Sequence, residues 1–231
     1  MKKTATSRLT VFFTVILIGA AMMSAGAPGG GCADAMALLD ETILKFSSWE
    51  CSFNHTVSMV SGGFTETEEG RLWAEKGGKM RWEYSAPAGK LAVTDGKTAW
   101  IYLPDEKRAY KLKVPSRKHL PVPLRLLSGR SKPSGEFFCV SSSSSGGVTT
   151  IELGFKEKDV KFRRLAVSLD ERERSITGIS YVDELDNKVS YSFSGGVKNG
   201  KIDPRLFSFT PPAGTRISEE ADDDVLRTIE K

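Results

Sequence analysis

The fold is decided by the stretch that runs from GRLW (Gly70–Trp73) through KMRWEY (Lys79–Tyr84) to VTDGKTAWIY (Val93–Tyr102). Within it, Met80, Trp82 and Tyr84 alternate with charged residues, a period of two that is typical of a strand with one apolar face. An Asp-Gly pair interrupts the last segment, where a hairpin has to turn. The stretch therefore predicts consecutive antiparallel strands in a curved sheet with one strongly apolar face.

Similar alternation continues on both sides of this stretch and predicts a series of strands. The predicted strands are Glu50–Ser61, Phe64–Lys76, Lys79–Tyr84, Lys90–Thr94, Lys97–Leu103, Arg108–Val114, Glu136–Ser141, Val148–Lys156, Leu165–Leu169, Ser175–Val182 and Lys188–Phe193. The serine run Ser141–Ser145 and the two glycines after it are interpreted as a flexible hairpin loop. The pattern predicts a mainly β protein of the α+β class.

Two helices are predicted beside the strands. The apolar positions of the first, at spacings of three and four from Asp34 onward, are Met36, Leu39, Ile43 and Phe46. Such an amphipathic helix covers one face of a sheet by default, and this one should end near residues 47–48. A second, short helix is predicted at Leu124–Leu127, because prolines precede it and a glycine follows. It is expected to lie across the sheet.

The first 33 residues are interpreted as a cleaved export leader, followed by one domain at residues 34–217 and an acidic tail at residues 218–231. A basic start at residues 2–8, the apolar run Leu9–Ala25 and then small residues form the layout of a secretory signal peptide. The apolar run is shorter than the roughly 20 residues that span a bilayer, which favours cleavage over a retained anchor. Lipidation of Cys32 is a further alternative. The mature protein is expected to be soluble and exported.

Charge and cysteine content restrict the possible functions. The leader carries three of the 33 basic residues, so its removal lowers the net charge from +4 to +1. The remaining charges of both signs are interleaved, which argues against a nucleic-acid partner. Cys51 and Cys139 would remain in the mature chain. In an oxidising compartment they could pair, or they could stay as two buried thiols, and the sequence leaves both possibilities open.

Patterns that carry catalysis or bind metals are not found in the sequence. The chain has two histidines, no group with zinc spacing, no phosphate loop, no dinucleotide fingerprint and no nucleophile elbow. His55 is expected on the surface of a strand. We therefore predict that the protein is not an enzyme and uses no metal or cofactor.

The apolar face of the predicted sheet has two interpretations. Its side chains can fill the interior, as in most proteins. Alternatively, the bent sheet leaves room for an apolar ligand, as in barrels that hold one small molecule. The pattern alone favours the filled interior.

A series of motifs adds a family resemblance. They are Cys51–Phe53 after the first helix, Gly70–Trp73, Met80–Tyr84, Val93–Tyr102, Pro123–Gly129 and Ile202–Gly214. In this order and spacing, from about residue 34 to residue 217, the chain resembles the periplasmic outer-membrane lipoprotein carriers, the LolA-like family.

The resemblance implies an unclosed antiparallel β-barrel in which an N-terminal helix and a short mid-chain helix act as a lid over an apolar cavity. It implies that acyl chains of lipoproteins occupy that cavity. An ATP-driven extractor in the inner membrane would supply the cargo, and an acceptor at the outer membrane would receive it. The resemblance also implies a monomer without a cofactor.

The implied site has a wall and a lid. Met80, Trp82 and Tyr84 are expected to form one wall of the apolar cavity, and Leu124 and Leu127 are expected to be lid contacts.

The residue expected to control the lid departs from the family pattern. Where the family usually has Arg-Pro after the second strand, this chain has Lys76-Gly77. Lysine keeps the charge but loses the planar fork of arginine. Two alternatives therefore stay open: a LolA-like carrier of another lipid, or an envelope sensor that binds lipoprotein without transporting it, which an anchor or a lipidated Cys32 would favour.

Overall fold

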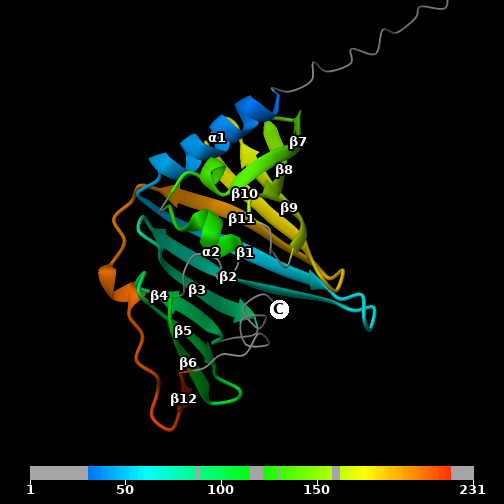
Figure 1. Ribbon diagram of the computed structural model, residues 1–231. Coiled ribbons are helices and arrows are strands. Elements are labelled where there is room, and N and C mark those ends of the chain that lie inside the picture. The colour runs from blue at the N-terminus through cyan, green and yellow to red at the C-terminus, as the bar shows by residue number, and fades with distance from the viewer. Residues whose placement is uncertain (1–30, 87–88, 115–121, 130, 158–161, 220–231) are drawn as a thin grey trace, which may run out of the picture.

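The computed structural model describes residues 31–86, 89–114, 122–129, 131–157 and 162–219 (Figure 1). Most of the predicted leader and of the acidic tail lies outside these residues. Among the described residues, no helix has the length and the apolar character needed to cross a bilayer.

The described residues form two α-helices, two short 3-10 helices and one sheet of twelve strands. The helices are α1 (Cys32–Lys45), α2 (Val122–Leu127), η2 (Pro133–Gly135) and η3 (Pro204–Phe207). The strands are β1 (Ser48–Ser58), β2 (Thr65–Glu75), β3 (Lys79–Ala86), β4 (Leu91–Thr94), β5 (Thr98–Leu103), β6 (Arg108–Lys113), β7 (Phe137–Ser145), β8 (Val148–Phe155), β9 (Phe162–Asp170), β10 (Ser175–Asp183), β11 (Lys188–Lys198) and β12 (Arg216–Ser218).

The order of the strands in the sheet is β12-β6-β5-β4-β3-β2-β1-β11-β10-β9-β8-β7. All neighbours are antiparallel except β12, which lies parallel to β6. The outer strands of this order, β12 and β7, do not pair with each other in the described part of the chain, so the sheet curves without closing (Figure 1). The predicted mainly β fold, an unclosed antiparallel barrel with an N-terminal helix and a short mid-chain helix, is confirmed.

Glycine allows the sheet to bend where β2 crosses β3. Glu69 pairs with Ala86 and Gly70 pairs with Tyr84, so Ser85 is the extra residue of a β-bulge near the end of β3. A Cβ atom at Gly70 would lie 2.1 Å from the carbonyl oxygen of Glu83 and 2.8 Å from the Phe53 ring. Only glycine fits this close approach, which explains the glycine of the GRLW segment.

The Asp-Gly turn of the decisive stretch forms as predicted. Asp95 Oδ1 accepts hydrogen bonds from the main-chain N–H groups of Lys97 and Thr98, at 2.8 and 2.7 Å. The bond from Thr98 is the largest cause that lowers the pKa of Asp95 below its ordinary value. The side chain therefore holds β4 and β5 in their hairpin register.

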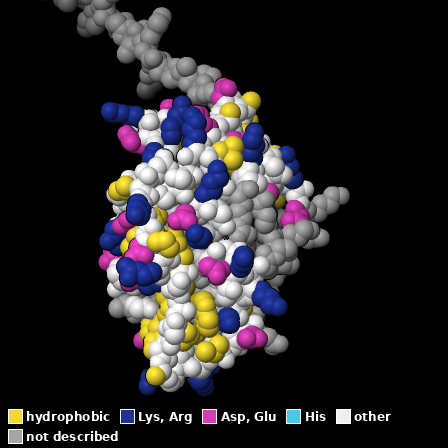
Figure 2. Space-filling view, turned by 90° about the vertical axis from the view of Figure 1, so that its left-hand side faces the viewer, with side chains coloured by type: hydrophobic (Ala, Val, Ile, Leu, Met, Phe, Trp, Pro, Cys, Tyr) yellow, Lys and Arg dark blue, Asp and Glu magenta, His cyan; other side chains and the backbone are white. Residues whose placement is uncertain are grey.

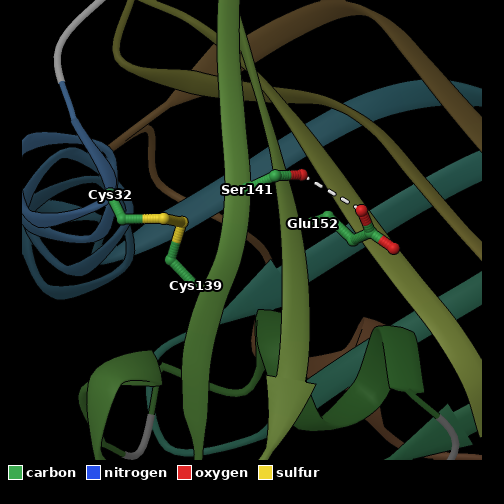
Figure 3. The surroundings of a disulfide bond; sticks show 4 residues. All are labelled: Cys32, Cys139, Ser141 and Glu152. Atoms are coloured by element: carbon green, nitrogen blue, oxygen red, sulfur yellow. Dashed lines mark hydrogen bonds between the residues drawn. A yellow bond between two sulfur atoms is a disulfide. The ribbon is translucent and has the colours of Figure 1, made fainter.

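The serine run was predicted wrongly as a flexible loop. Ser141–Ser145 belong to β7 and pair with β8, and the turn is confined to the two glycines that follow. The Ser141 hydroxyl donates to Glu152 Oε2 at 3.0 Å across the pair (Figure 3). Main-chain pairing and such cross-strand bonds outweigh the low strand preference of serine.

The cysteines pair differently from either possibility weighed for Cys51 and Cys139. Cys139 on β7 forms a disulfide with Cys32 in the first turn of α1, and the two Cα atoms are 5.5 Å apart (Figure 3). Cys51 is a free, buried thiol. Burial raises the pKa of Cys51 to about 12. The bond fastens the beginning of α1 to the edge strand of the sheet.

The main core lies between the two helices and one face of the sheet. This face carries Met80, Trp82 and Tyr84 and is called the inner face below. Helix α1 contributes Ala35, Leu39 and Ile43 to the core, and α2 contributes Leu126 and Leu127. On the outside, Lys and Arg are interspersed with Asp and Glu over the surface drawn in Figure 2.

Candidate functional site: the inner face and the helices that cover it

The three predicted wall residues lie together on β3. Met80, Trp82 and Tyr84 are 2%, 3% and 2% exposed. The ring of Phe53 on β1 makes edge contacts with the rings of Trp82 and Tyr84, with centroids 5.0 Å apart in both pairs. Edge contacts of this kind fix the orientation of aromatic rings as well as burying them. The contact of these residues with a ligand stays a prediction.

Aromatic residues that the sequence did not assign to the site extend this surface. Trp49 packs edge-on against Phe193 with centroids 5.0 Å apart, and Trp82 lies 5.5 Å from Tyr191. The alternation in the last predicted strand indicates that Tyr191 and Phe193 share a face. Their position beside β3 depends on the pairing of β1 with β11, a long-range contact that local pattern does not specify.

Helix α1 covers the inner face and is held at several points along its length. Leu39 and Ile43 point into the core and are fully or almost fully buried. On its other side, the Asp40 carboxylate accepts hydrogen bonds from the N–H and the hydroxyl of Ser134, at 2.9 and 2.5 Å. Together with the bond between Cys32 and Cys139, these contacts tie most of α1 to η2 and β7.

Helix α2 is short and contributes two consecutive leucines to the core. Leu127, a predicted lid residue, is 1% exposed, as is Leu126. The other predicted lid residue, Leu124, belongs to α2, but its side chain lies outside those that the structure describes. The contact of both leucines with a ligand stays a prediction.

A buried arginine that the sequence did not single out anchors α2. Arg125 is 6% exposed, and its Nη2 lies 3.2 Å from Glu136 Oε2. Its guanidinium also lies over the rings of Phe137 and Phe155, at 5.7 and 5.4 Å from their centroids. A planar cation suits an ion pair and aromatic faces at once.

Lys76, the expected lid-control residue, lies where the ends of both helices meet. Its Nζ lies 3.3 Å from the main-chain carbonyl oxygen of Leu44 in the last turn of α1, and its N–H donates to the carbonyl of Ser47. A Cβ atom at Gly129, just after α2, would lie 3.0 Å from the Phe46 ring and 3.6 Å from Lys76 Cγ. The turn after β2 therefore contacts the last turn of α1 and lies beside Gly129, two residues after the end of α2. Control of a lid by Lys76 stays a prediction.

A polar cluster is buried in the inner face, away from the end of α1. Lys90 Nζ lies 2.5 and 2.6 Å from the carboxylate oxygens of Glu68, and His55 Nδ1 lies 3.2 Å from Glu68 Oε2. His55 is fully buried and stacks on Tyr191, so its predicted surface position is wrong. Burial lowers the pKa of Lys90, and Glu68 opposes this shift.

No group of three or more His, Cys, Asp or Glu side chains in the described ranges is arranged to hold a metal ion. The geometry of the inner face is thus that of an apolar surface under two helices, with one buried ion pair.

Comparison with known proteins identifies the family. Residues 45–210 match the family model described as "Outer membrane lipoprotein carrier protein LolA". The chain belongs to the LolA family. The match includes Lys76, the wall residues and α2, so all the predicted site residues lie inside the family region.

Two relatives of this LolA-family chain are each named "Outer-membrane lipoprotein carrier protein". The protein of Chromobacterium violaceum is 27% identical over 201 residues, which are 87% of this chain and 95% of the relative. The protein of Azotobacter vinelandii is 30% identical over 164 residues, 70% of this chain and 77% of the relative. An uncharacterized conserved protein from Thermus thermophilus shares the fold, with a TM-score of 0.50, 10% identity and coverage of 81% and 99%.

Proposed function

We propose that this LolA-family protein is a periplasmic carrier that binds the acyl chains of lipoproteins and shuttles them from the inner to the outer membrane. The observation that carries this proposal is the shared core of the helices and the inner face. Side chains of α1 and α2 are buried in the same cluster as Met80, Trp82 and Tyr84. The family match and the names of the two relatives support the proposal.

Acyl chains would take the place of the helix side chains. When a helix moves away, its leucines leave the inner face and apolar surface becomes exposed to water. Burial of an acyl chain there stabilises the open protein by about 0.8 kcal/mol per CH₂ group. Cargo therefore shifts the balance from the closed to the open protein, and the empty protein closes again.

We assign the movement mainly to α2, because α1 is held by stronger contacts. Helix α1 is bonded covalently to β7 through Cys32 and is hydrogen-bonded to η2 through Asp40. Helix α2 has six residues and is held by Leu126, Leu127 and the Arg125–Glu136 pair. Leu127 would leave the inner face with it, Leu124 is proposed as the second lid contact, and Lys76 would release the end of α1.

The proposed route has two exchange steps and no chemical reaction. An ATP-driven extractor in the inner membrane hands over the lipoprotein, and an acceptor at the outer membrane takes it. The carrier acts as a monomer, without a cofactor and without enzymatic activity. The disulfide fits export into an oxidising compartment.

The experiment that tests this function is to purify the exported protein from the periplasm and to identify what is bound by native mass spectrometry. Bound triacylated lipoprotein is the expected result. Bound free phospholipid or glycolipid would instead indicate a carrier of another lipid. An empty protein that does not respond to acyl ligands would overturn both.

Variants of the site sharpen this experiment. Trp82→Asp places a charge on the inner face and is expected to abolish cargo binding while export persists. Leu127→Gln on α2 is the milder variant if the first does not fold. Val60→Asp, at a position that is 62% exposed, is the matched control and should leave cargo binding unchanged. Full cargo binding in a folded Trp82→Asp protein would contradict the assignment of the wall.

A further inference from the structure

A small cavity lies beneath α1, between this helix, the end of α2 and strands β1, β10 and β11. Its apolar lining includes Ile43, Phe46, Leu127 and Ile176. The space accessible to water is about 20 Å³, enough for one water molecule. The cavity can therefore hold one small group of atoms in a fixed position.

Two of the residues that line this cavity each carry a buried polar group. They are the hydroxyl of Thr42 and the indole N–H of Trp49, and neither has a hydrogen-bond partner among the described residues. The two residues are only 7% and 6% exposed. Buried polar groups almost always have partners in native proteins, because leaving them unpaired costs free energy. Two such groups beside one cavity therefore indicate that a hydrogen-bond acceptor occupies it, either a water molecule or an atom of a ligand.

The chemistry of the two groups defines what that ligand carries. An indole nitrogen can only donate a hydrogen bond, and a hydroxyl can donate as well. Both therefore fit one acceptor oxygen that has an apolar substituent. A carbonyl oxygen on a hydrocarbon chain has these properties.

The charged residues at the cavity favour an acceptor over a donor. Arg174 and Lys198 both line it. Arg174 Nη1 lies 3.4 Å from Glu41 Oε2, and Lys198 Nζ donates to the main-chain carbonyls of Glu173 and Arg174. A ligand amine would meet the positive charge of both side chains, whereas a carbonyl oxygen is attracted to it.

We propose that this cavity is the docking point for the carbonyl oxygen of an acyl ester or acyl amide, which rests on the carrier function proposed above. The oxygen accepts hydrogen bonds from Trp49 and Thr42, and the hydrocarbon chain continues past Leu127 over the inner face. The site thereby distinguishes acyl chains, which carry a carbonyl group, from alkyl chains of the same length.

The test compares two soluble probes that differ only in the carbonyl group: a dodecanoyl sugar ester and the dodecyl ether of the same sugar, both below their micelle concentrations. Binding to the exported protein, purified from the periplasm, is measured by calorimetry. Two hydrogen bonds predict that the ester binds about ten-fold more tightly than the ether. Equal binding of both probes would overturn the docking point and leave the carrier function standing. Binding of neither probe would overturn both.

Three variants locate the preference. Thr42→Val and Trp49→Phe remove one donor each at nearly constant volume, and each is expected to lower the ester-to-ether ratio about three-fold while the ether affinity is unchanged. Trp100→Phe is the matched control, because this tryptophan packs against Phe209, does not line the cavity and is not one of the wall residues. It should keep the full ratio. An unchanged ratio in the folded Thr42→Val and Trp49→Phe proteins would contradict the assignment.

Discussion

Lys76 joins the turn after β2 to the last turn of α1, because its Nζ donates to the main-chain carbonyl oxygen of Leu44 at 3.3 Å. A cation at this end of a helix also interacts favourably with the helix dipole. The family resemblance predicts an arginine here, whose fork could bond two carbonyls at once. The lysine thus keeps a contact with helix α1. Unlike an arginine, it does not offer several donors in a fixed planar geometry.

Loss of this contact should loosen the end of α1. We expect Lys76→Ala to lower the free energy that opening of the lid requires by about 0.5–1 kcal/mol. The effect is small because the hydrogen bond is exposed to solvent. That loss corresponds to a two- to five-fold rise in the open fraction. Amide hydrogen exchange at residues 43–46 and the uptake rate of a fluorescent acyl probe measure it.

Two further variants serve as controls for Lys76. Lys45→Ala removes a lysine from the last turn of α1 that is 74% exposed and pairs only with Glu41 among the contacts described for it. It should leave probe uptake unchanged. Lys76→Arg should slow uptake below that of the natural protein. Equal uptake in all four proteins would show that Lys76 does not hold the lid.

The thiol count of the folded protein should be zero. Cys32 and Cys139 are bonded, and the pKa of Cys51 is raised to about 12 by burial, so no thiolate is available near pH 8. Unfolding without reductant should expose one thiol, and unfolding with reductant should expose all three cysteines. A chromogenic disulfide reagent measures each value. Reactive Cys139 in the oxidised, unfolded protein would contradict the pairing.

Reduction of the disulfide should destabilise the fold. The bond joins residues 107 positions apart. The loss of chain entropy in the unfolded state predicts that a disulfide across a loop of this length adds about 4–5 kcal/mol to the free energy of unfolding. For a chain of this size, that is a fall in Tm of roughly 10 °C. Cys32→Ser should reproduce the fall in the absence of reductant. An unchanged Tm in this variant would mean that other contacts hold α1.

The buried pair of Lys90 and Glu68 should show strong coupling. Lys90→Met leaves the Glu68 carboxylate, which is only 4% exposed, without its cation. We expect the free energy of unfolding to fall by about 3–5 kcal/mol. The double variant Glu68→Gln, Lys90→Met should recover much of this loss. Urea unfolding of the single and double variants gives the coupling energy. Simple additivity would show that the two side chains do not depend on each other.

Asp203 should make stability depend on pH at the acidic end. Hydrogen bonds from Arg205 lower the pKa of Asp203 from 3.8 to about 2. Because the pKa of Asp203 is lower in the folded protein than in the unfolded chain, its ionised carboxylate stabilises the fold. This contribution to stability is complete above pH 3.8 and is lost as the pH falls through about 2. The stability difference between the natural protein and Asp203→Asn should shrink over this range. NMR can monitor the titration of the Asp203 carboxyl group. A midpoint near pH 4 would contradict the lowered pKa.

Local patterns explain which parts of the fold were predictable. The strands around Trp82 were found because their alternation is carried by neighbouring residues. The run Ser141–Ser145 was misjudged because its strand depends on pairing with β8, not on its own side chains. His55 was placed on the surface because the sequence does not show Glu68 opposite it.

The site itself was predictable only in part. Lys76 could be singled out because the resemblance marks its position. The roles of Arg125 and Trp49 depend on contacts with Glu136 and with the cavity under α1, which arise only in the folded chain. Two buried donors without partners leave no trace in a hydrophobic pattern.

The covalent bond of Cys32 also restricts how the exported chain matures. A leader cut after residue 33 would discard this cysteine, and a sulfur in a disulfide cannot carry a lipid. We therefore expect signal peptidase to act upstream of Cys32, within the small residues of Ala25–Gly31, and the product to diffuse without an anchor. The intact mass of the periplasmic protein would reveal the cut.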